Sequence, residues 1–340
     1  MFINECLISK GQCLNKEGRK EGRKEGWKEG RRMIQTEKRV AAPVISVLGG
    51  TRHVGIPYIR EFLAHGLKVK ILARSPKRVA ERFPRAEVFQ GSMMNADDVR
   101  KVVEGVDGAF LITPIGGNDN ADLEIRAATA AITASQITRL PHLIFCSVIQ
   151  SDQITGVPLL DVKLSIERLI RESGLPWSAL RTGCYMEDWL EFKPSLLKKG
   201  IYFFPIRSAH QLSFTSQRDV SRVAVSLLRI NKVLYGPLDV IEPVTRTLDE
   251  VARLFGEYLG RKVVHAGGSL LPILKVLQPV VFRWLKPVLA SKVRLATYLD
   301  SHDWCGDPSQ LARVLPEFQV TSLDQYLAHR YENLTITQGM

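Results

Sequence analysis

The chain has 340 residues, of which 45% are hydrophobic and 24% charged, and its formal charge is +12. At roughly 150 residues per domain, this length predicts about two domains with a real hydrophobic core, and the composition excludes a disordered, collagenous or coiled-coil protein. No apolar run approaches the roughly 18 residues of a membrane-spanning helix.

The first segment, residues 1–39, repeats a Lys-Glu-Gly-Arg unit that begins at Lys16. Glycine at every fourth position disfavours a helix, so we expect a disordered basic tail. A nuclear-targeting or docking arm is the alternative to a solvated tail. The fold starts soon afterwards, and we hypothesise that Met33 is the natural start and that residues 1–32 are absent from the native protein.

From residue 43 onward, strands alternate with helices. Short β-branched or apolar runs predict strands over 44–48, 68–73, 86–89, 108–113, 143–148 and 178–181. Helical spacing predicts helices over 54–65, 79–83, 99–103, 121–137 and 162–170. Such an alternation with short connections implies a parallel sheet covered on both faces. The fold class is therefore α/β, a doubly wound, Rossmann-like parallel sheet over residues 40–182.

After residue 182 the alternation is lost. Two later helices are expected, over 219–228 and over 248–259 with a stop at Gly260. We expect residues 183–335 to form a smaller α/β substrate domain that closes over the carboxyl ends of the strands, where ligands bind in open α/β sheets.

The turn between the first strand and the first helix reads Gly-Gly-Thr-Arg-His-Val-Gly. Glycine lets a pyrophosphate approach the backbone, and the helix N-terminus offers N–H donors. The candidate cofactor-binding residues of this turn are Gly49, Thr51, Arg52, His53, Val54 and Gly55. Arg52 stands where a glycine is usual, so it either contacts phosphate or obstructs the site. A turn kept only for packing is the alternative.

The end of the second strand distinguishes NADP(H) from NAD(H). Residues 62–80 contain no acid, whereas Arg74, Lys77 and Arg78 cluster just past the strand. An acid would bind the ribose hydroxyls of NAD, while a guanidinium grips a 2′-phosphate. We therefore expect NADP(H) to be preferred, with Arg74 and Lys77 as its contacts; the alternative is solvated surface charge.

With these features assembled, the chain resembles the NmrA-like family of atypical short-chain dehydrogenase/reductases. The matching segments are the 49–55 turn, 73–75, 90–92, 163–167, 173–181 and 218–220. The resemblance implies an NADP(H)-binding Rossmann domain with a small substrate domain. It also implies either a reductase acting on small organic molecules or a redox-sensing regulator that binds the cofactor without turnover.

Two positions depart from the family pattern. Ser92 replaces an aspartate that reaches the adenine in the family; it is shorter but can still hydrogen-bond, so we keep it as a cofactor-binding candidate. Leu159 replaces the tyrosine of the Tyr-x-x-x-Lys pair. Lys163 matches the family lysine, which implies a cofactor contact to the nicotinamide ribose or, once desolvated, a catalytic general acid. The alternative is a surface lysine on an amphipathic helix.

Three further side chains are candidates for this site. Ser147 ends an apolar strand near the expected nicotinamide position, or merely ends the strand. Tyr185 and Trp189, spaced i and i+4, are expected to line the substrate side; aromatic core packing is the alternative.

Other partners are weakly supported. The histidines have no metal-ligand spacing, and the basic residues are not gathered into a nucleic-acid patch, so we expect neither a metal nor specific nucleic acid. Residues 270–295 are apolar and basic and could form a peripheral membrane contact, a lid or a dimer face. The five dispersed cysteines indicate a reducing, cytoplasmic location, with nuclear entry if the tail is a targeting signal.

The sequence thus favours an NADP(H)-dependent oxidoreductase that reduces a small organic substrate, with Lys163 assisting. A non-catalytic NADP(H) sensor is the alternative, because the tyrosine is missing.

Overall fold

The computed structural model describes residues 42–51, 54–113, 121–189, 197–207, 209–268 and 287–337. Residues 42–340 group together as one unit, separate from residues 1–41. The disorder expected of residues 1–39 lies outside the described residues, and so do Arg52 and His53 of the glycine turn.

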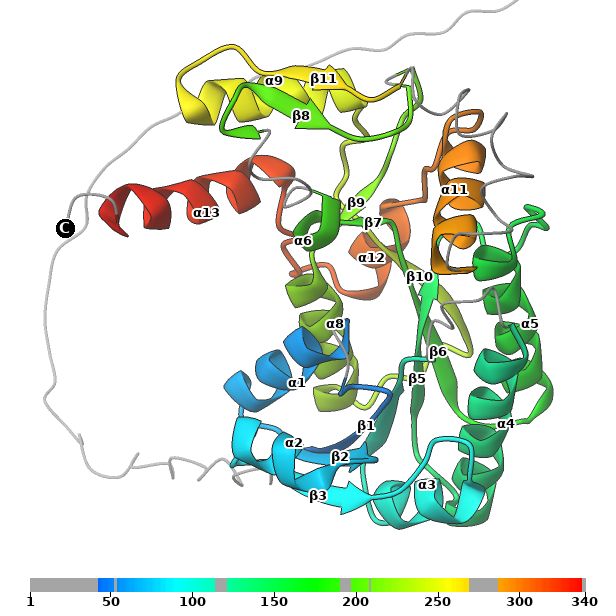
Figure 1. Cartoon of the computed structure of the whole chain (residues 1–340). Coiled ribbons are helices and arrows are strands. Elements are labelled where there is room, and N and C mark those ends of the chain that lie inside the picture. The colour runs from blue at the N-terminus through cyan, green and yellow to red at the C-terminus, as the bar shows by residue number, and fades with distance from the viewer. Residues whose placement is uncertain are drawn as a thin grey trace, which may run out of the picture. The chain divides into compact units, whose positions relative to one another are not determined.

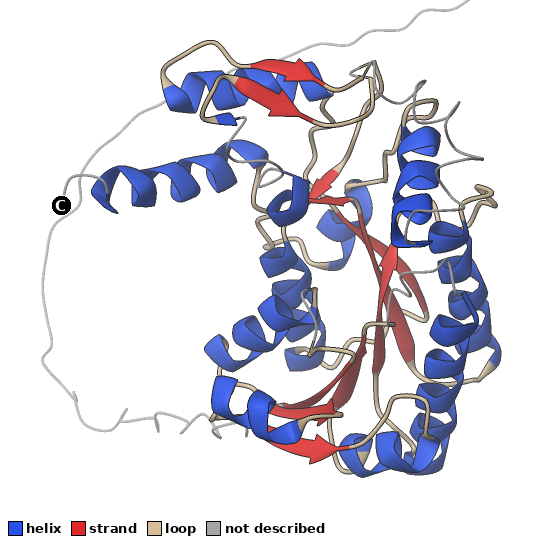
Figure 2. Cartoon of the chain, viewed as in Figure 1, coloured by secondary structure: helices blue, strands red, loops and turns tan. Residues whose placement is uncertain are grey.

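Seven parallel strands form the central sheet in the order β10-β6-β5-β4-β1-β2-β3. Their bounds are β1 Val44–Leu48, β2 Lys68–Ala73, β3 Glu87–Gln90, β4 Gly108–Leu111, β5 Leu143–Val148, β6 Trp177–Thr182 and β10 Gly236–Val240. Helices cover both faces of this sheet (Figure 2). The doubly wound α/β fold is confirmed. All the carboxyl ends lie along one edge, because every pairing in this sheet is parallel.

Two groups of helices enclose the sheet (Figure 1). On one face lie α1 (Gly55–Ala64) and α8 (Gln217–Arg229), and on the other α3 (Ala96–Val103), α4 (Ala121–Thr138) and α5 (Pro158–Glu172). The short α2 (Pro76–Arg82) follows β2. Each face has its own buried core: Phe62 and Phe110 lie in the first, and Val162 and Trp177 in the second. The apolar runs and the apolar helical positions found in the sequence therefore form these two cores.

The sheet extends beyond the boundary expected at residue 182. Its last strand, β10, pairs with β6 from Gly236 opposite Ser178 to Val240 opposite Thr182. The run Gly-Pro-Leu-Asp-Val was not expected to be a strand, because Pro and Asp are rare in central strands. At the edge of a sheet a proline is tolerated, since its missing N–H faces away from the ladder. A strand from the region expected to form the smaller domain therefore completes the central sheet.

The remaining elements build a third buried cluster beyond the strand ends. Two small parallel pairs occur, β7 (Cys184–Tyr185) with β9 (Phe214–Thr215) and β8 (Ile201–Phe203) with β11 (Val264–Ala266). The helices are α6 (Met186–Trp189), α9 (Leu248–Leu259), α11 (Pro287–Leu299), α12 (Ser309–Val314) and α13 (Leu323–Thr337). Ile149, after β5, and Leu160, on α5, pack in the same cluster as Phe214 and Phe255. The C-terminal half thus rests on the carboxyl end of the sheet.

Helix α9 has the bounds that the sequence predicts. Thr247 and Glu250 form a reciprocal capping box at its start, and Gly260 adopts a left-handed conformation at its end with φ +63°.

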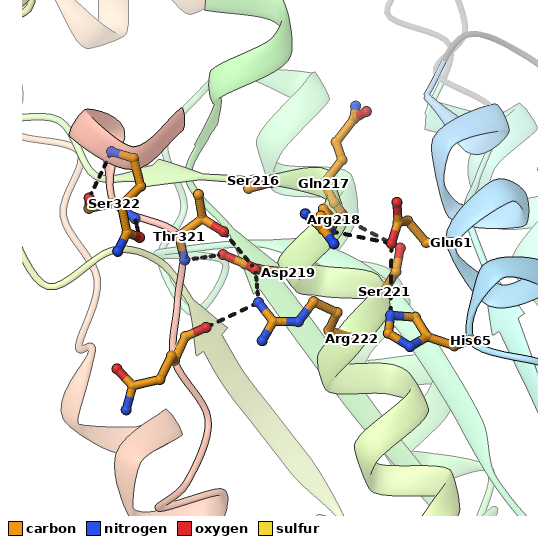
Figure 3. Close-up of polar contacts among 12 residues, drawn as sticks. Glu61, His65, Ser216, Gln217, Arg218, Asp219, Ser221, Arg222, Thr321 and Ser322 are labelled. Atoms are coloured by element: carbon orange, nitrogen blue, oxygen red, sulfur yellow. Dashed lines mark hydrogen bonds and ion pairs between the residues drawn. The ribbon is translucent and has the colours of Figure 1, made fainter. Parts of the chain in front are cut away.

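Two buried carboxylates hold the segment that leads into α13, and Figure 3 shows the contacts of one of them, Asp219. Asp219, on α8, accepts hydrogen bonds from the Thr321 backbone N–H at 2.6 Å and from Arg222 at 2.8 Å. Glu242, just after β10, accepts one from the Leu323 backbone N–H at 2.9 Å, and burial raises the pKa of its carboxyl to about 7. The C-terminal helix is therefore anchored by buried acidic side chains.

Candidate functional site

The turn between β1 and α1 leaves no room for side chains. Gly49 has φ +85°, and a Cβ there would lie 1.9 Å from the carbonyl oxygen of Ile112. A Cβ on Gly55 would lie 2.3 Å from the Cα of Gly50, and one on Gly50 would lie 2.5 Å from Cγ1 of Val47. These positions therefore require glycine, and the turn presents bare backbone at the carboxyl end of the sheet. The close approach of Gly49 to Ile112 also places the glycine turn against the loop that follows β4.

The start of α1 is open to an anion. Val54 precedes the helix without a side-chain cap, and the first turn contains no acid. Uncapped N–H groups and the positive end of the helix dipole favour phosphate at this point. Thr51 is exposed beside it, whereas Arg52 and His53 lie outside the described residues.

Basic side chains follow β2. Arg74 and Lys77 are exposed, and neither makes a hydrogen bond or ion pair with another described residue. Pro76 begins α2, so the chain turns away directly after Arg74. Arg74 and Lys77 therefore lie at the same edge of the sheet as the glycine turn, where their charges can bind an anionic group.

Ser92 makes hydrogen bonds within its own loop. Its hydroxyl accepts a hydrogen bond from the Met94 backbone N–H at 3.2 Å, and its backbone N–H donates to Asp98 at 3.0 Å. A Cβ on Gly91 would lie 2.7 Å from the Cβ of Asp98. The structure thus gives Ser92 a role in closing the loop after β3.

Lys163 is buried and ion-paired. Its Nζ lies 2.6 Å from Oε2 of Glu124 and 2.8 Å from Oγ1 of Thr113, and the Thr113 hydroxyl donates to the same carboxylate oxygen. The exposed fractions are 6% for Lys163, 3% for Glu124 and 2% for Thr113. A surface lysine is therefore excluded. Since Thr113 follows Ile112, this triad lies next to the loop that contacts Gly49.

Ser147 belongs to a second buried network one helical turn along α5. Its hydroxyl donates to Oε1 of Glu167 at 2.6 Å, and Ser151 donates to the same oxygen at 2.6 Å. Arg181, on β6, donates to the other Glu167 oxygen at 2.8 Å. Because Ser147 gives its hydrogen to Glu167, its hydroxyl can only accept from a further group.

The hydroxyl of Tyr185 is turned toward the sheet. It lies 2.8 Å from the Tyr58 hydroxyl and 3.4 Å from Sγ of Cys146. Burial is the main cause that raises the pKa of all three groups, so each stays neutral at physiological pH. Trp189 ends α6, and its side chain lies outside the described part of the structure.

A buried carboxyl holds the element that follows Tyr185. Glu187, on α6, accepts hydrogen bonds from the Ser216 hydroxyl at 3.2 Å and from the Gln217 backbone N–H at 3.0 Å. Burial raises the pKa of Glu187 to about 7. This contact fixes α6 against the start of α8.

Several of these hydrogen-bond partners were not predicted from the sequence. Glu124 and Thr113 lie 39 and 50 residues from Lys163, and Tyr58 lies 127 residues from Tyr185. The one local signal was Glu124 itself, an acid on an otherwise alanine-rich helix face.

Two other expectations concern partners. Within the described ranges, His, Cys, Asp and Glu side chains form no group of three or more suited to a metal ion. No described helix combines the length and apolarity needed to cross a membrane. Of the 270–295 segment, residues up to 286 lie outside the described residues, and the rest belongs to α11.

Known reductases share parts of this sequence. An NAD(P)H azoreductase of Xenophilus azovorans is 24% identical over 228 residues, which are 67% of this chain and 78% of the azoreductase. A (4-alkanoyl-5-oxo-2,5-dihydrofuran-3-yl)methyl phosphate reductase of Streptomyces griseus is 29% identical over 188 residues. That match covers 54% of this chain and 63% of the reductase, so the chain spans less than two thirds of its length.

The fold has solved counterparts. An NADPH-dependent quinone oxidoreductase of Escherichia coli, crystallised with NADPH, superposes with a TM-score of 0.69. The comparison covers 84% of this chain and 99% of that protein at 17% identity, and it shows a shared fold. The NmrA-like family matches residues 42–288. That match covers most of the chain and confirms the resemblance found in the sequence: this chain belongs to the NmrA-like family.

Proposed function

We propose that this protein binds NADP(H) and catalyses the NADP(H)-dependent reduction of a small organic substrate. The observation that carries the proposal is the glycine turn, in which Gly49, Gly50 and Gly55 exclude any Cβ directly before an uncapped helix. Such a cradle fits a pyrophosphate, which needs bare backbone and N–H donors. The reductase names of the relatives support the same reaction class.

The charges after β2 support NADP(H) over NAD(H). Arg74 and Lys77 are exposed at the carboxyl edge of the sheet, and no acid occupies residues 62–80. A carboxylate there would repel a 2′-phosphate, whereas a guanidinium binds it with charge-assisted hydrogen bonds. Thr51, Val54 and the residues between them would complete the contact with the phosphates.

When bound, the cofactor supplies a hydride to one face of the substrate. The protein's own task is to hold both molecules and to exclude water. Lys163 lies beside the loop after β4, at the edge that carries the glycine turn. Ser147 offers a hydrogen-bond acceptor near the end of β5, and the partly buried Tyr185 would line the substrate side.

A sensor without turnover is the second candidate. Position 159 is Leu, so no phenol stands one helical turn before Lys163 to protonate a substrate oxygen. The Lys163 ammonium is held by Glu124, and the Tyr185 hydroxyl is held by Tyr58. These contacts favour binding without proton delivery, whereas the reductase relatives favour catalysis.

Turnover assays on the full chain separate the two candidates. NADPH absorbance is followed with quinones, azo compounds and triphenylmethane dyes as acceptors. Acceptor-dependent loss of NADPH that disappears in Gly55→Val supports the reductase. Binding of NADPH without loss across the panel supports the sensor, and absence of NADPH binding contradicts both.

A further inference from the structure

Lys163 is held by two partners, a carboxylate and a hydroxyl, that also contact each other. Lys163, Glu124 and Thr113 come from α5, α4 and the loop after β4, and their polar atoms form a closed triangle. Because the Thr113 hydroxyl donates to Glu124, it can only accept from Lys163. Two of the three ammonium hydrogens therefore have fixed acceptors, and the orientation of Nζ is set by both.

The surroundings of the ammonium are otherwise weakly polar. The Phe145 ring of β5 lies 5.8 Å from Nζ, and Cys146, the next residue, interacts with the charge. Burial raises the pKa of the Cys146 thiol, so the thiol stays neutral at physiological pH. Glu167, one turn along α5, is already engaged by Arg181 and the two serines. Glu124 is thus the carboxylate that balances the charge of Lys163.

We propose that Glu124 and Thr113 are positioning residues that hold Lys163 as a permanent cation beside the cofactor, where it binds and orients NADP(H) instead of supplying a proton. The proposal rests on the proposed function. A buried ammonium that loses its carboxylate partner becomes costly to keep charged. Removal of the Glu124 charge should therefore convert Lys163 into a group that gives up its proton near neutral pH.

The test measures NADPH affinity by fluorescence titration from pH 7 to pH 9. A phosphate monoester has its second pKa near 6, so the ligand keeps a constant charge across this window. For the unaltered chain we expect the dissociation constant to vary by less than about twofold. For Glu124→Gln we expect NADPH affinity to fall about tenfold between pH 7 and pH 9, as Lys163 loses its charge.

Two control variants separate positioning from a structural role. In K163R/E124Q the cation cannot deprotonate, so the pH dependence should vanish even if affinity is lower. In K163M/E124M the buried pair is replaced by apolar side chains, a change that proteins often tolerate. Its NADPH affinity should be low at every pH. If Glu124 has only a structural role, Glu124→Gln should lower thermal stability, but the pH dependence of its NADPH affinity should match that of the unaltered chain.

Thr113→Val keeps the ion pair and offers a second route if Glu124→Gln does not fold. Loss of the hydroxyl should weaken NADPH binding about fivefold without adding pH dependence. The inference is overturned if Glu124→Gln binds NADPH with unchanged pH dependence, or if Thr113→Val binds as tightly as the unaltered chain. If the unaltered chain does not bind NADPH, the proposed function fails as well, so the two failures are distinguishable.

Discussion

Substitution of Gly49 by alanine tests whether the turn is fixed by close backbone contact. At φ +85° a non-glycine residue costs about 1–2 kcal/mol. The added Cβ would also lie 1.9 Å from the Ile112 carbonyl oxygen, which belongs to the backbone and cannot rotate away. Overpacking of this kind costs about 1–3 kcal/mol, so Gly49→Ala should lower the free energy of unfolding by about 2–5 kcal/mol.

The matched control is Gly66→Ala. Gly66 has a similar φ of +78°, but a Cβ there meets no atom within 4 Å, so only the cost of about 1–2 kcal/mol for the left-handed conformation applies. Urea denaturation of both variants gives the difference between their free energies of unfolding, and this difference is the cost of the steric clash alone. Equal destabilisation of the two variants would refute the close approach of the turn to the loop after β4. We also expect Gly49→Ala to weaken NADPH binding, whereas Gly66→Ala leaves it unchanged.

Three further predictions address charge. Arg74→Ala should weaken NADPH binding about tenfold and leave NADH binding unchanged, as measured by titration with both cofactors. The control Arg100→Ala, on the exposed side of α3, should change the affinity for neither cofactor. Glu242 has a pKa of about 7 in the folded protein and an ordinary value of 4.5 in the unfolded chain. Between these two pH values the folded protein keeps a proton that the unfolded chain has released, so the free energy of unfolding falls as pH rises. Glu242→Gln should flatten this decline in urea midpoints, and an unchanged slope would contradict it. Asp219→Ala should cost about 2 kcal/mol and expose the C-terminal segment to proteolysis. Its neighbour Arg218, 63% exposed and 3.6 Å from Glu61 (Figure 3), should cost under about 0.5 kcal/mol when changed to alanine.

Local patterns in the sequence predicted most of the sheet. Strand 143–148 has the predicted bounds, because a largely continuous apolar run bounded by turn residues indicates a buried parallel strand. Strand 68–73 also has the predicted bounds, although Lys68 and Lys70 interrupt its apolar residues. The end of α9 was also predicted, since Gly260 adopts the left-handed conformation that glycine favours. The strand at Gly236–Val240 was missed because it contains a proline and an aspartate and acquires its role only by pairing with β6.

The candidate site was less predictable than the fold. The glycine turn is local in sequence and could be found there. The partners of Lys163 and Ser147 are tertiary: Glu124 and Glu167 are acids on helices, a common pattern on solvated faces. Only the packing of α4, α5 and the strand ends turns them into buried charges that fix the neighbouring side chains. The same holds for Tyr185, whose hydroxyl contacts that of Tyr58, 127 residues earlier in the chain.

Equilibrium titration of the full chain with NADPH and with NADH is the most direct measurement of the central claim, that the β1–α1 turn holds a dinucleotide. We predict saturable binding of both dinucleotides, tighter for NADPH by about tenfold. The preference should be abolished in Arg74→Ala, and all binding should be abolished in Gly55→Val. Failure of the unaltered chain to bind either dinucleotide would contradict it.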